Sequence, residues 1–222
     1  MIAAIVLAAG RATRMGEPKV LLSLGGRTLL AHVIAAAQAS ACGSVIVVAG
    51  SHAGDVRREA EALGAQVVVN PRYAEGMASS LAAGVAALPS DCEAAVVLLG
   101  DQPRVGAAAI DRLVAAYRAT GKPMVLSRCG DAAGGAPAVM PSSPAAGPPA
   151  LIARPLFAEV AALTGDAGAR GIAARHPDRV AEVRLAPDEA WDVDTPDDFA
   201  RLKQALEHDR HAGDRRRAGG SP

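Results

Sequence analysis

The stretch from residue 2 to residue 19, IAAIVLAAGRATRMGEPK, decides the fold. Its first seven residues form a continuous apolar run, which is typical of a strand buried on both faces of a parallel sheet. SVIVVA, QVVV and AAVVLL repeat the pattern further along, and helix-length segments separate the runs, at residues 28–41, 54–63, 77–88 and 107–119. This alternation predicts an α/β fold with helices on both faces of a parallel sheet. Ligands of such sheets bind beyond the carboxyl ends of the strands.

The second half of the chain is less regular. Residues 130–149 are rich in glycine, proline, serine and alanine, which predicts a loop with at most a short strand around 138–140. Two helices, a strand and a final helix are expected after it, near residues 155–163, 168–174, 180–185 and 196–207. Thr195 or Asp194 would cap the final helix. We expect one domain over residues 1–207 and a disordered tail over 208–222, whose arginines lie among glycines without an apolar period.

The composition excludes several classes of protein. The 23 basic and 23 acidic side chains of this 222-residue chain balance, which argues against a protein that mainly binds nucleic acid or an anionic membrane. Three dispersed cysteines without a C-x-x-C pair indicate a reducing compartment rather than disulfides or a zinc site. The sequence shows neither the charge order of a signal peptide nor the run of ~18 apolar residues that a membrane span needs. We therefore expect a cytoplasmic protein without nucleic-acid or membrane partners.

The loop after the first apolar run could bind phosphate. It contains Gly10 and Gly16, and its backbone N–H groups could surround phosphate oxygens while Arg14 and Lys19 neutralise their charge. The pattern is not a Walker loop, because five residues separate the glycines and Glu17 follows the second one. It is not the dinucleotide fingerprint either, since no G-x-G occurs in the chain. A tight turn with solvated arginines is the alternative.

Acidic residues follow at two further places. Asp101 comes directly after the apolar run AAVVLL, where a carboxylate can hold Mg²⁺ together with phosphate oxygens. Asp192 and Asp194 flank Val193 and would lie on the same side of an extended segment. The alternatives are a turn stabilised by Asp101 and a helix cap formed by Asp194. A polar segment, NPRYAEGMASSL at residues 70–81, could bind a base or a phosphate through hydroxyl and N–H groups.

Five segments in register resemble the nucleotidyltransferases of the molybdenum cofactor pathway, particularly the CTP:molybdopterin cytidylyltransferases. They are LAAGRATRMGEPKVLL, GMASSLAAG, LLGDQP, LTGDAGARG and WDVDTPDDF, and they span residues 2 to about 206. The resemblance implies a three-layer, Rossmann-like nucleotidyltransferase fold with a mostly parallel mixed sheet. It also implies Mg²⁺-dependent transfer of CMP from CTP to the molybdenum–molybdopterin cofactor. A molybdoenzyme or its chaperone would then be a partner that receives the product.

The resemblance further implies roles for individual residues. Arg14, Lys19 and Asp101 would be catalytic, and Asp194, with Asp192 as a helper, would complete the metal site of Asp101. Three residues would lie towards the acceptor: Gln102, Asp166 and Arg170. The nucleotide-binding set would be Leu7, Ala8, Ala9, Gly10, Arg14, Lys19 and Ser80. Residues 128–149 depart from the family pattern, which leaves the identity of the acceptor open.

The choice of base and the class of activity have alternatives. Guanylyltransferase relatives usually carry a glycine where this chain has Ala9, whose methyl group favours the smaller pyrimidine base. GMP transfer or a different acceptor phosphate is the alternative within the family. A nicotinamide-dependent oxidoreductase and a protein that delivers the cofactor without catalysis are the alternatives from other classes.

Overall fold

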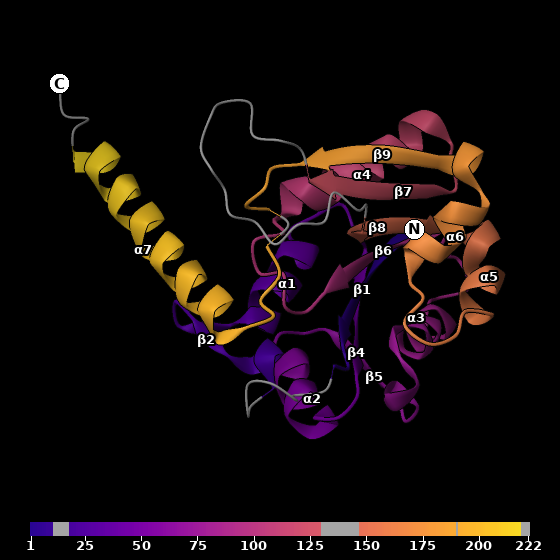
Figure 1. The fold of residues 1–222 in the computed structure, drawn as a ribbon, viewed down its shortest axis with the longest axis horizontal. Helices are drawn as coiled ribbons and strands as arrows, with labels where there is room; N and C mark the ends of the chain where they lie inside the picture. The colour runs from indigo at the N-terminus through magenta and orange to yellow at the C-terminus, as the bar shows by residue number, and fades with distance from the viewer. Residues whose placement is uncertain (11–17, 130–146, 190, 219–222) are drawn as a thin grey trace.

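Seven strands form one sheet in the order β5-β4-β1-β6-β8-β7-β9 (Figure 1). The computed structural model describes residues 1–10, 18–129, 147–189 and 191–218. The strands are β1 (Ile2–Ala8), β4 (Ser44–Ala49), β5 (Gln66–Val69), β6 (Ala94–Leu99), β7 (Met124–Cys129), β8 (Gly147–Ala153) and β9 (Val180–Leu185). A short hairpin of β2 (Ser23–Leu24) and β3 (Arg27–Thr28) stands apart from the sheet. The predicted α/β class with a mostly parallel mixed sheet is therefore confirmed.

The central strand β1 organises the sheet. All seven of its residues are buried, and it pairs in parallel with β4 on one side and β6 on the other. The chain runs outward from β1 through β4 to β5, then returns to place β6 on the opposite side of β1. Such a reversal of strand order opens a crevice at the carboxyl ends of the two strands, where open α/β sheets bind ligands. The crevice here lies between the residues that follow Ala8 and those that follow Leu99.

Strands β7 and β8 were not predicted from the sequence. Strand β8, which lies between β6 and β7, runs antiparallel to both of them, which makes the sheet mixed. Its first residues are Gly147, Pro148 and Pro149, a sequence typical of a loop, because proline has no N–H to donate to the hydrogen bonds of a sheet. The structure accommodates both prolines through a shift of the β7–β8 register between Leu126 and Ser127, and pairing with β6 starts only at Ala150. The short strand expected around 138–140 lies outside the described residues.

Helices cover both faces of the sheet (Figure 1). Helices α1 (Leu29–Gln38), α2 (Ala53–Ala62) and α4 (Ala107–Thr120) pack on one face, and α3 (Met77–Ala86), α5 (Phe157–Ala161) and α6 (Ala169–Arg175) pack on the other. Side chains of β1 alternate between the two layers, with Ala4 and Val6 facing the first and Ile5 and Leu7 the second. The three layers bury the aliphatic core that the apolar runs predict. None of the described helices is both long and apolar enough to span a bilayer.

The last helix, α7 (Pro196–Ala218), is longer than predicted. Thr195 caps it, because its Oγ1 accepts a hydrogen bond from the Asp198 N–H (3.1 Å) while the Asp198 carboxylate accepts one from the Thr195 N–H (2.9 Å). The expected end near Glu207 was wrong, because residues 208–218 continue the helix away from the sheet (Figure 1). A helix that is nucleated at a capped end can propagate without an apolar period. Residues 219–222 lie outside the described chain.

The close approach of α3 to the sheet depends on Gly84. A Cβ atom at this position would lie 2.6 Å from Ile5 Cγ2 and 3.1 Å from Val48 Cγ2. We expect Gly84→Ala to destabilise the protein by about 1–3 kcal/mol in urea unfolding, because overpacking outweighs the better helix propensity of alanine. The control is Gly171→Ala in α6, where the new Cβ would meet no atom nearer than 3.7 Å and should stabilise the helix. A Gly84→Ala protein as stable as wild type would contradict the prediction.

Candidate active site

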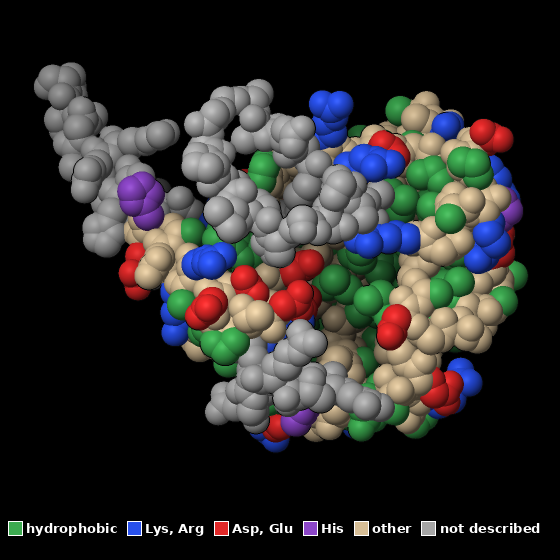
Figure 2. All heavy atoms as spheres, in the orientation of Figure 1, with side chains coloured by type: hydrophobic (Ala, Val, Ile, Leu, Met, Phe, Trp, Pro, Cys, Tyr) green, Lys and Arg blue, Asp and Glu red, His purple; other side chains and the backbone are tan. Residues whose placement is uncertain are grey.

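A cleft of about 650 Å³ lies beyond the carboxyl ends of β1 and β6. Acidic side chains gather near the middle of the face shown in Figure 2, next to a hollow with a hydrophobic floor. Segments far apart in the sequence form the walls of this cleft. Its described lining consists of residues 7–10, 18–20 and 73–77 together with His52, Val56, Ser80, Leu99, Asp101, Asp166, Asp192 and Asp194.

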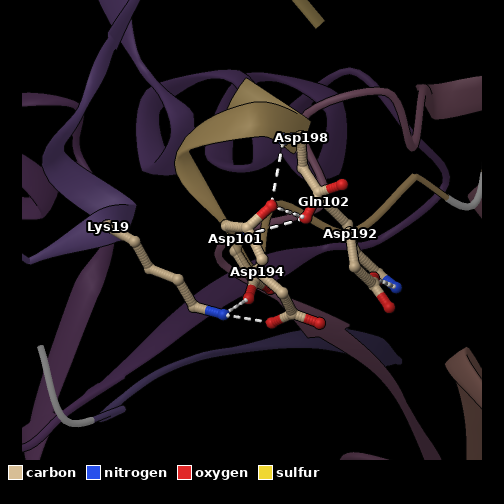
Figure 3. A network of polar contacts seen from close by, with 7 residues as sticks. Lys19, Asp101, Gln102, Asp192, Asp194 and Asp198 are labelled. Carbon is tan, nitrogen blue, oxygen red and sulfur yellow. Dashed lines mark hydrogen bonds and ion pairs between the residues drawn. The ribbon is translucent and has the colours of Figure 1, made fainter. Parts of the chain in front are cut away.

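One lysine lies between two carboxylates at the carboxyl end of β6 (Figure 3). Lys19 begins a short 3₁₀ helix, Lys19–Leu21, and its Nζ forms ion pairs with Asp101 and, at 2.9 Å, with Asp194. Burial by itself lowers the pKa of Lys19, but the two carboxylates outweigh it, so the pKa is raised overall. Lys19 therefore stays charged and compensates the buried Asp101, of which only 8% is exposed.

The second acidic segment is anchored to the first by its backbone. The Val193 N–H donates a hydrogen bond to the Asp101 carbonyl oxygen (3.2 Å). The Val193 side chain is fully buried and packs with Leu29 and Leu202. Asp192 and Asp194, on either side of it, both line the cleft, as the alternation around Val193 predicts. Asp194 pairs with Lys19, and Asp192 accepts a hydrogen bond from Gln102 (Figure 3).

The carboxylate of Asp192 sits in a crowded, acidic environment, although part of the residue is exposed. Burial of the carboxyl group raises the pKa of Asp192 to about 6, and the negative charges of Asp101 and Asp194 act in the same direction. A hydrogen bond from Gln102 and the charge of Lys19 lower the pKa and oppose the shift. The cluster therefore tolerates two carboxylates beside Lys19 more readily than three.

The three residues expected to face the acceptor lie in different places. Gln102 is buried rather than in the cleft lining, and its Nε2 donates to Asp192 Oδ1 and to the Pro148 carbonyl (3.3 Å). Asp166 does line the cleft, and its Oδ1 also accepts the Met77 N–H (3.3 Å) at the start of α3. The Arg170 guanidinium lies against Gly147 at the start of β8, and Arg170 is not part of the described cleft lining. Gln102 thus connects Asp192 to the sheet.

Most of the residues predicted to bind the nucleotide line the cleft. Residues 7–10, Lys19 and Ser80 line it, whereas Arg14 lies outside the described residues. The cleft lining also includes Tyr73 and Met77, which lie in the segment 70–81 expected to bind a base or a phosphate, and His52 and Val56, which were not expected there. The rule that pointed to the residues following β1 and β6 applies equally to β4, and would have found His52.

The carboxylates of Asp101 and Asp194 suit a hard divalent cation. They already surround a positive charge, the Lys19 ammonium group, and Mg²⁺ typically takes one or two carboxylates and completes its shell with phosphate oxygens and water. Within the described ranges, no three His, Cys, Asp or Glu side chains form a closed metal centre. The donor set therefore fits a cation that arrives with a phosphate ligand better than a structural metal.

A family model described as the MobA-like NTP transferase domain matches residues 4–180. The chain belongs to this family. It is a nucleotidyltransferase superfamily, in agreement with the resemblance found in the sequence. The family assignment and the Lys19–Asp101–Asp194 cluster both point to chemistry at a nucleoside triphosphate.

Solved structures and curated relatives agree with this membership. The Rv0371c protein of Mycobacterium tuberculosis H37Rv superposes with a TM-score of 0.75 at 31% identity, covering 91% of this chain and 97% of that one. Its complex with manganese gives a TM-score of 0.73 at 30% identity, with coverage of 91% and 98%. Nicotine blue oxidoreductase of Paenarthrobacter nicotinovorans is 31% identical over 213 residues, 90% of this chain and 96% of that protein. Bifunctional GlmU of Leifsonia xyli subsp. xyli is 38% identical over 127 residues, 54% of this chain, and the match spans only 26% of that protein.

Lys19 should stabilise the metal-free fold. Lys19→Met leaves the largely buried Asp101 without its ion pair, so we expect a loss of about 1–3 kcal/mol in urea unfolding. Millimolar Mg²⁺ or Mn²⁺ should restore part of the loss, since a divalent cation can replace the missing ammonium charge. Arg57→Met, which removes an exposed partner of Glu61, serves as the control and should cost less than about 0.5 kcal/mol. If Lys19→Met were as stable as wild type and neither cation changed its stability, Lys19 would not be what compensates the charge of Asp101.

Asp192 should make stability fall as the pH rises. Its folded-state pKa of about 6 lies above the ordinary 3.8, so folding favours the protonated form. The stabilising contribution is complete below about pH 3.8 and is lost as the pH rises through about 6. Asp192→Asn removes this dependence, so the variant should gain stability relative to wild type between pH 4.5 and pH 7. If the free energies of unfolding of the two proteins changed equally with pH across that range, the raised pKa of Asp192 would be contradicted.

Proposed function

We propose that the protein is a cytoplasmic, Mg²⁺-dependent cytidylyltransferase that transfers CMP from CTP to the phosphate of the molybdenum–molybdopterin cofactor. The observation that carries the proposal is the ion-paired cluster of Lys19, Asp101 and Asp194 at the edge of the cleft. The membership in a nucleotidyltransferase family supports the reaction class. The manganese complex of the Mycobacterium relative supports a divalent cation. The cofactor as acceptor rests on the five sequence segments.

In this reaction an oxygen of the acceptor phosphate attacks the α-phosphorus of CTP in line. The new bond joins that oxygen to the α-phosphorus, and the bond to the β-phosphate oxygen breaks to release pyrophosphate. Both reactants are anions, so the barrier depends on positioning and on neutralising charge. Lys19 would bind the phosphates of CTP, assisted by Arg14 from the preceding loop. The acceptor phosphate is already ionised near neutral pH, so the attack needs no strong general base.

Asp101 and Asp194 would hold the metal ion. When bound, Mg²⁺ would neutralise charge on the α-phosphate and orient the reacting oxygens. Asp192 would support the site from the position in which Gln102 holds it. Asp166, in the cleft lining, and Arg170, next to β8, are the proposed contacts towards the acceptor.

Ala9 supports the preference for cytosine. It is buried, lines the cleft and lies tightly against Gly50, where an added Cβ would come within 2.6 Å of the Ala9 carbonyl oxygen. This contact would keep Ala9 in place beside a bound base, and its methyl group would leave less room for a purine than a glycine does. A single methyl group discriminates by roughly 1–3 kcal/mol, so the preference should be partial.

The relative from Paenarthrobacter favours a second candidate function. It covers nearly all of this chain and bears the name of an oxidoreductase. A nicotinamide-dependent reductase needs a site for a dinucleotide, whereas this chain has no G-x-G segment. Hydride transfer also has no evident use for a lysine held between two carboxylates. Binding of NADH therefore distinguishes this candidate from the cytidylyltransferase.

The test is pyrophosphate release with each of the four nucleoside triphosphates, Mg²⁺ and purified molybdenum cofactor. We expect kcat/KM for CTP to exceed that for GTP by about tenfold or more, and Ala9→Gly to narrow the ratio without inverting it. Asp101→Asn should reduce kcat by about a hundredfold or more through loss of the metal clamp, while Asp178→Asn, outside the cleft lining, should leave it unchanged.

The outcomes separate the parts of the proposal. A wild-type preference for GTP would overturn the choice of base and leave nucleotidyl transfer standing. Release with CTP but only in the presence of another acceptor phosphate would overturn the choice of acceptor. Binding of NADH without pyrophosphate release from any nucleotide would favour the oxidoreductase.

A further inference from the structure

A buried amide lies beneath one end of the cleft and organises two serine hydroxyl groups. Asn70, which follows β5, is only 2% exposed. Its Nδ2 donates hydrogen bonds to Ser79 Oγ (2.9 Å) and Ser80 Oγ (3.0 Å), and its Oδ1 accepts one from the Arg72 N–H (2.9 Å). Because an N–H faces the oxygen, the orientation of the amide is determined by its partners. Both serines must therefore accept from Asn70.

The hydroxyl protons of Ser79 and Ser80 then point to different places. Ser79 Oγ donates towards the backbone carbonyls of Arg72 (2.8 Å) and Gly76 (2.9 Å), so its proton stays within the protein. For the Ser80 hydroxyl, the described part of the chain offers no acceptor, and Ser80 lines the cleft. One lone pair of Ser80 is occupied by Asn70, which leaves its O–H free to donate to a bound ligand.

We propose that Asn70 is a positioning residue that holds the Ser80 hydroxyl as a hydrogen-bond donor to a carbonyl oxygen of the nucleotide base. This inference rests on the proposed function, in that it assigns one end of the same cleft to the base. Asn70 touches no ligand itself. It acts by deciding that Ser80 presents a proton, and not a lone pair, to the cleft.

The surroundings of Ser80 favour a neutral acceptor over a phosphate group. The start of α3 would otherwise offer N–H groups to an anion, but the Met77 N–H donates to Asp166 Oδ1 (3.3 Å) and the Ala78 N–H to the Gly165 carbonyl (3.0 Å). The carboxylate of Asp166 at this position also repels phosphate. The neighbouring lining includes the flat, largely apolar ring of Tyr73 and the thioether of Met77. A base carbonyl fits this end of the cleft, and the triphosphate fits the end that carries Lys19.

The experiment measures binding of CTP by calorimetry with Mg²⁺ and without any acceptor. Ser80→Ala should weaken binding about five- to tenfold, the effect of one lost hydrogen bond. The matched control is Ser79→Ala, which removes the same hydroxyl from the same network but not from the cleft lining, and should change affinity less than about twofold. Inorganic tripolyphosphate is the second probe, and its affinity should be the same in wild type and both variants.

Asn70→Asp tests the positioning role with an isosteric side chain. A carboxylate accepts hydrogen bonds but donates none, so Ser80 should turn its proton to residue 70 and present lone pairs to the base. We expect CTP to bind at least about tenfold more weakly, and the double variant with Ser80→Ala to bind no more weakly than Asn70→Asp alone. A thermal melt checks folding. Where Asn70→Asp does not fold, Asn70→Ala frees the hydroxyl to rotate and should weaken CTP binding about threefold.

Three results would overturn the inference. Equal losses of CTP and tripolyphosphate affinity in Ser80→Ala would place the hydroxyl at a phosphate. Wild-type affinity for CTP in the folded Asn70 variant would remove Asn70 from the site, and an effect of Ser79→Ala equal to that of Ser80→Ala would indicate general disruption. If the wild-type protein prefers GTP, only the proposed specificity for CTP is overturned. Guanine also carries a carbonyl oxygen, so the same variants would then be compared for their binding of GTP.

Discussion

The parallel pairing of β1 with both β4 and β6 is the constraint on which the rest of the structure depends. Leu7 lies opposite Val48 on one side and Leu99 on the other, so the three strands end at the same level. The loop after β1 and the turn that carries Asp101 consequently meet at one edge of the sheet. Because β1 is buried along its whole length, a slip in register would move apolar side chains and the site together.

Electrostatic balance is the second organising feature. The sheet brings Asp101 to the cleft, and the buried Val193 brings Asp192 and Asp194 to it, so three carboxylates meet in a partly desolvated place. Lys19 compensates two of them, and the raised pKa of Asp192 reflects the cost of ionising the third. Such a cluster is suited to a cation and to phosphates that accompany it, which is the physical basis of the proposed reaction.

The two ends of the cleft differ in character because of contacts between distant segments. At one end the charged groups gather around Lys19. At the other, Gly165 and Asp166 satisfy the N–H groups of α3 and remove the attraction for anions that a helix N-terminus normally has. Gly76 permits this close contact, since its φ is +110° and a Cβ atom added there would lie 2.3 Å from the Gly165 carbonyl oxygen, which excludes a side chain. The proposed nucleotide would therefore bind with its phosphates near Lys19 and its base near Ser80.

Much of this could be predicted from the sequence, wherever a local pattern reports directly on burial. The apolar runs predicted β1, β4, β5 and β6 with their observed bounds, and the alternation around Val193 predicted that Asp192 and Asp194 lie on the same, cleft-facing side. Strand β8 escaped prediction because its prolines are tolerated only through a register shift against β7, and α7 was longer than expected because a capped helix needs no apolar period to continue. The inward position of Gln102 and the hydrogen bond that Ser80 accepts from Asn70 were decided by tertiary structure alone. Hydrogen-bond direction depends on which partners meet across the fold, and no spacing along the chain records that.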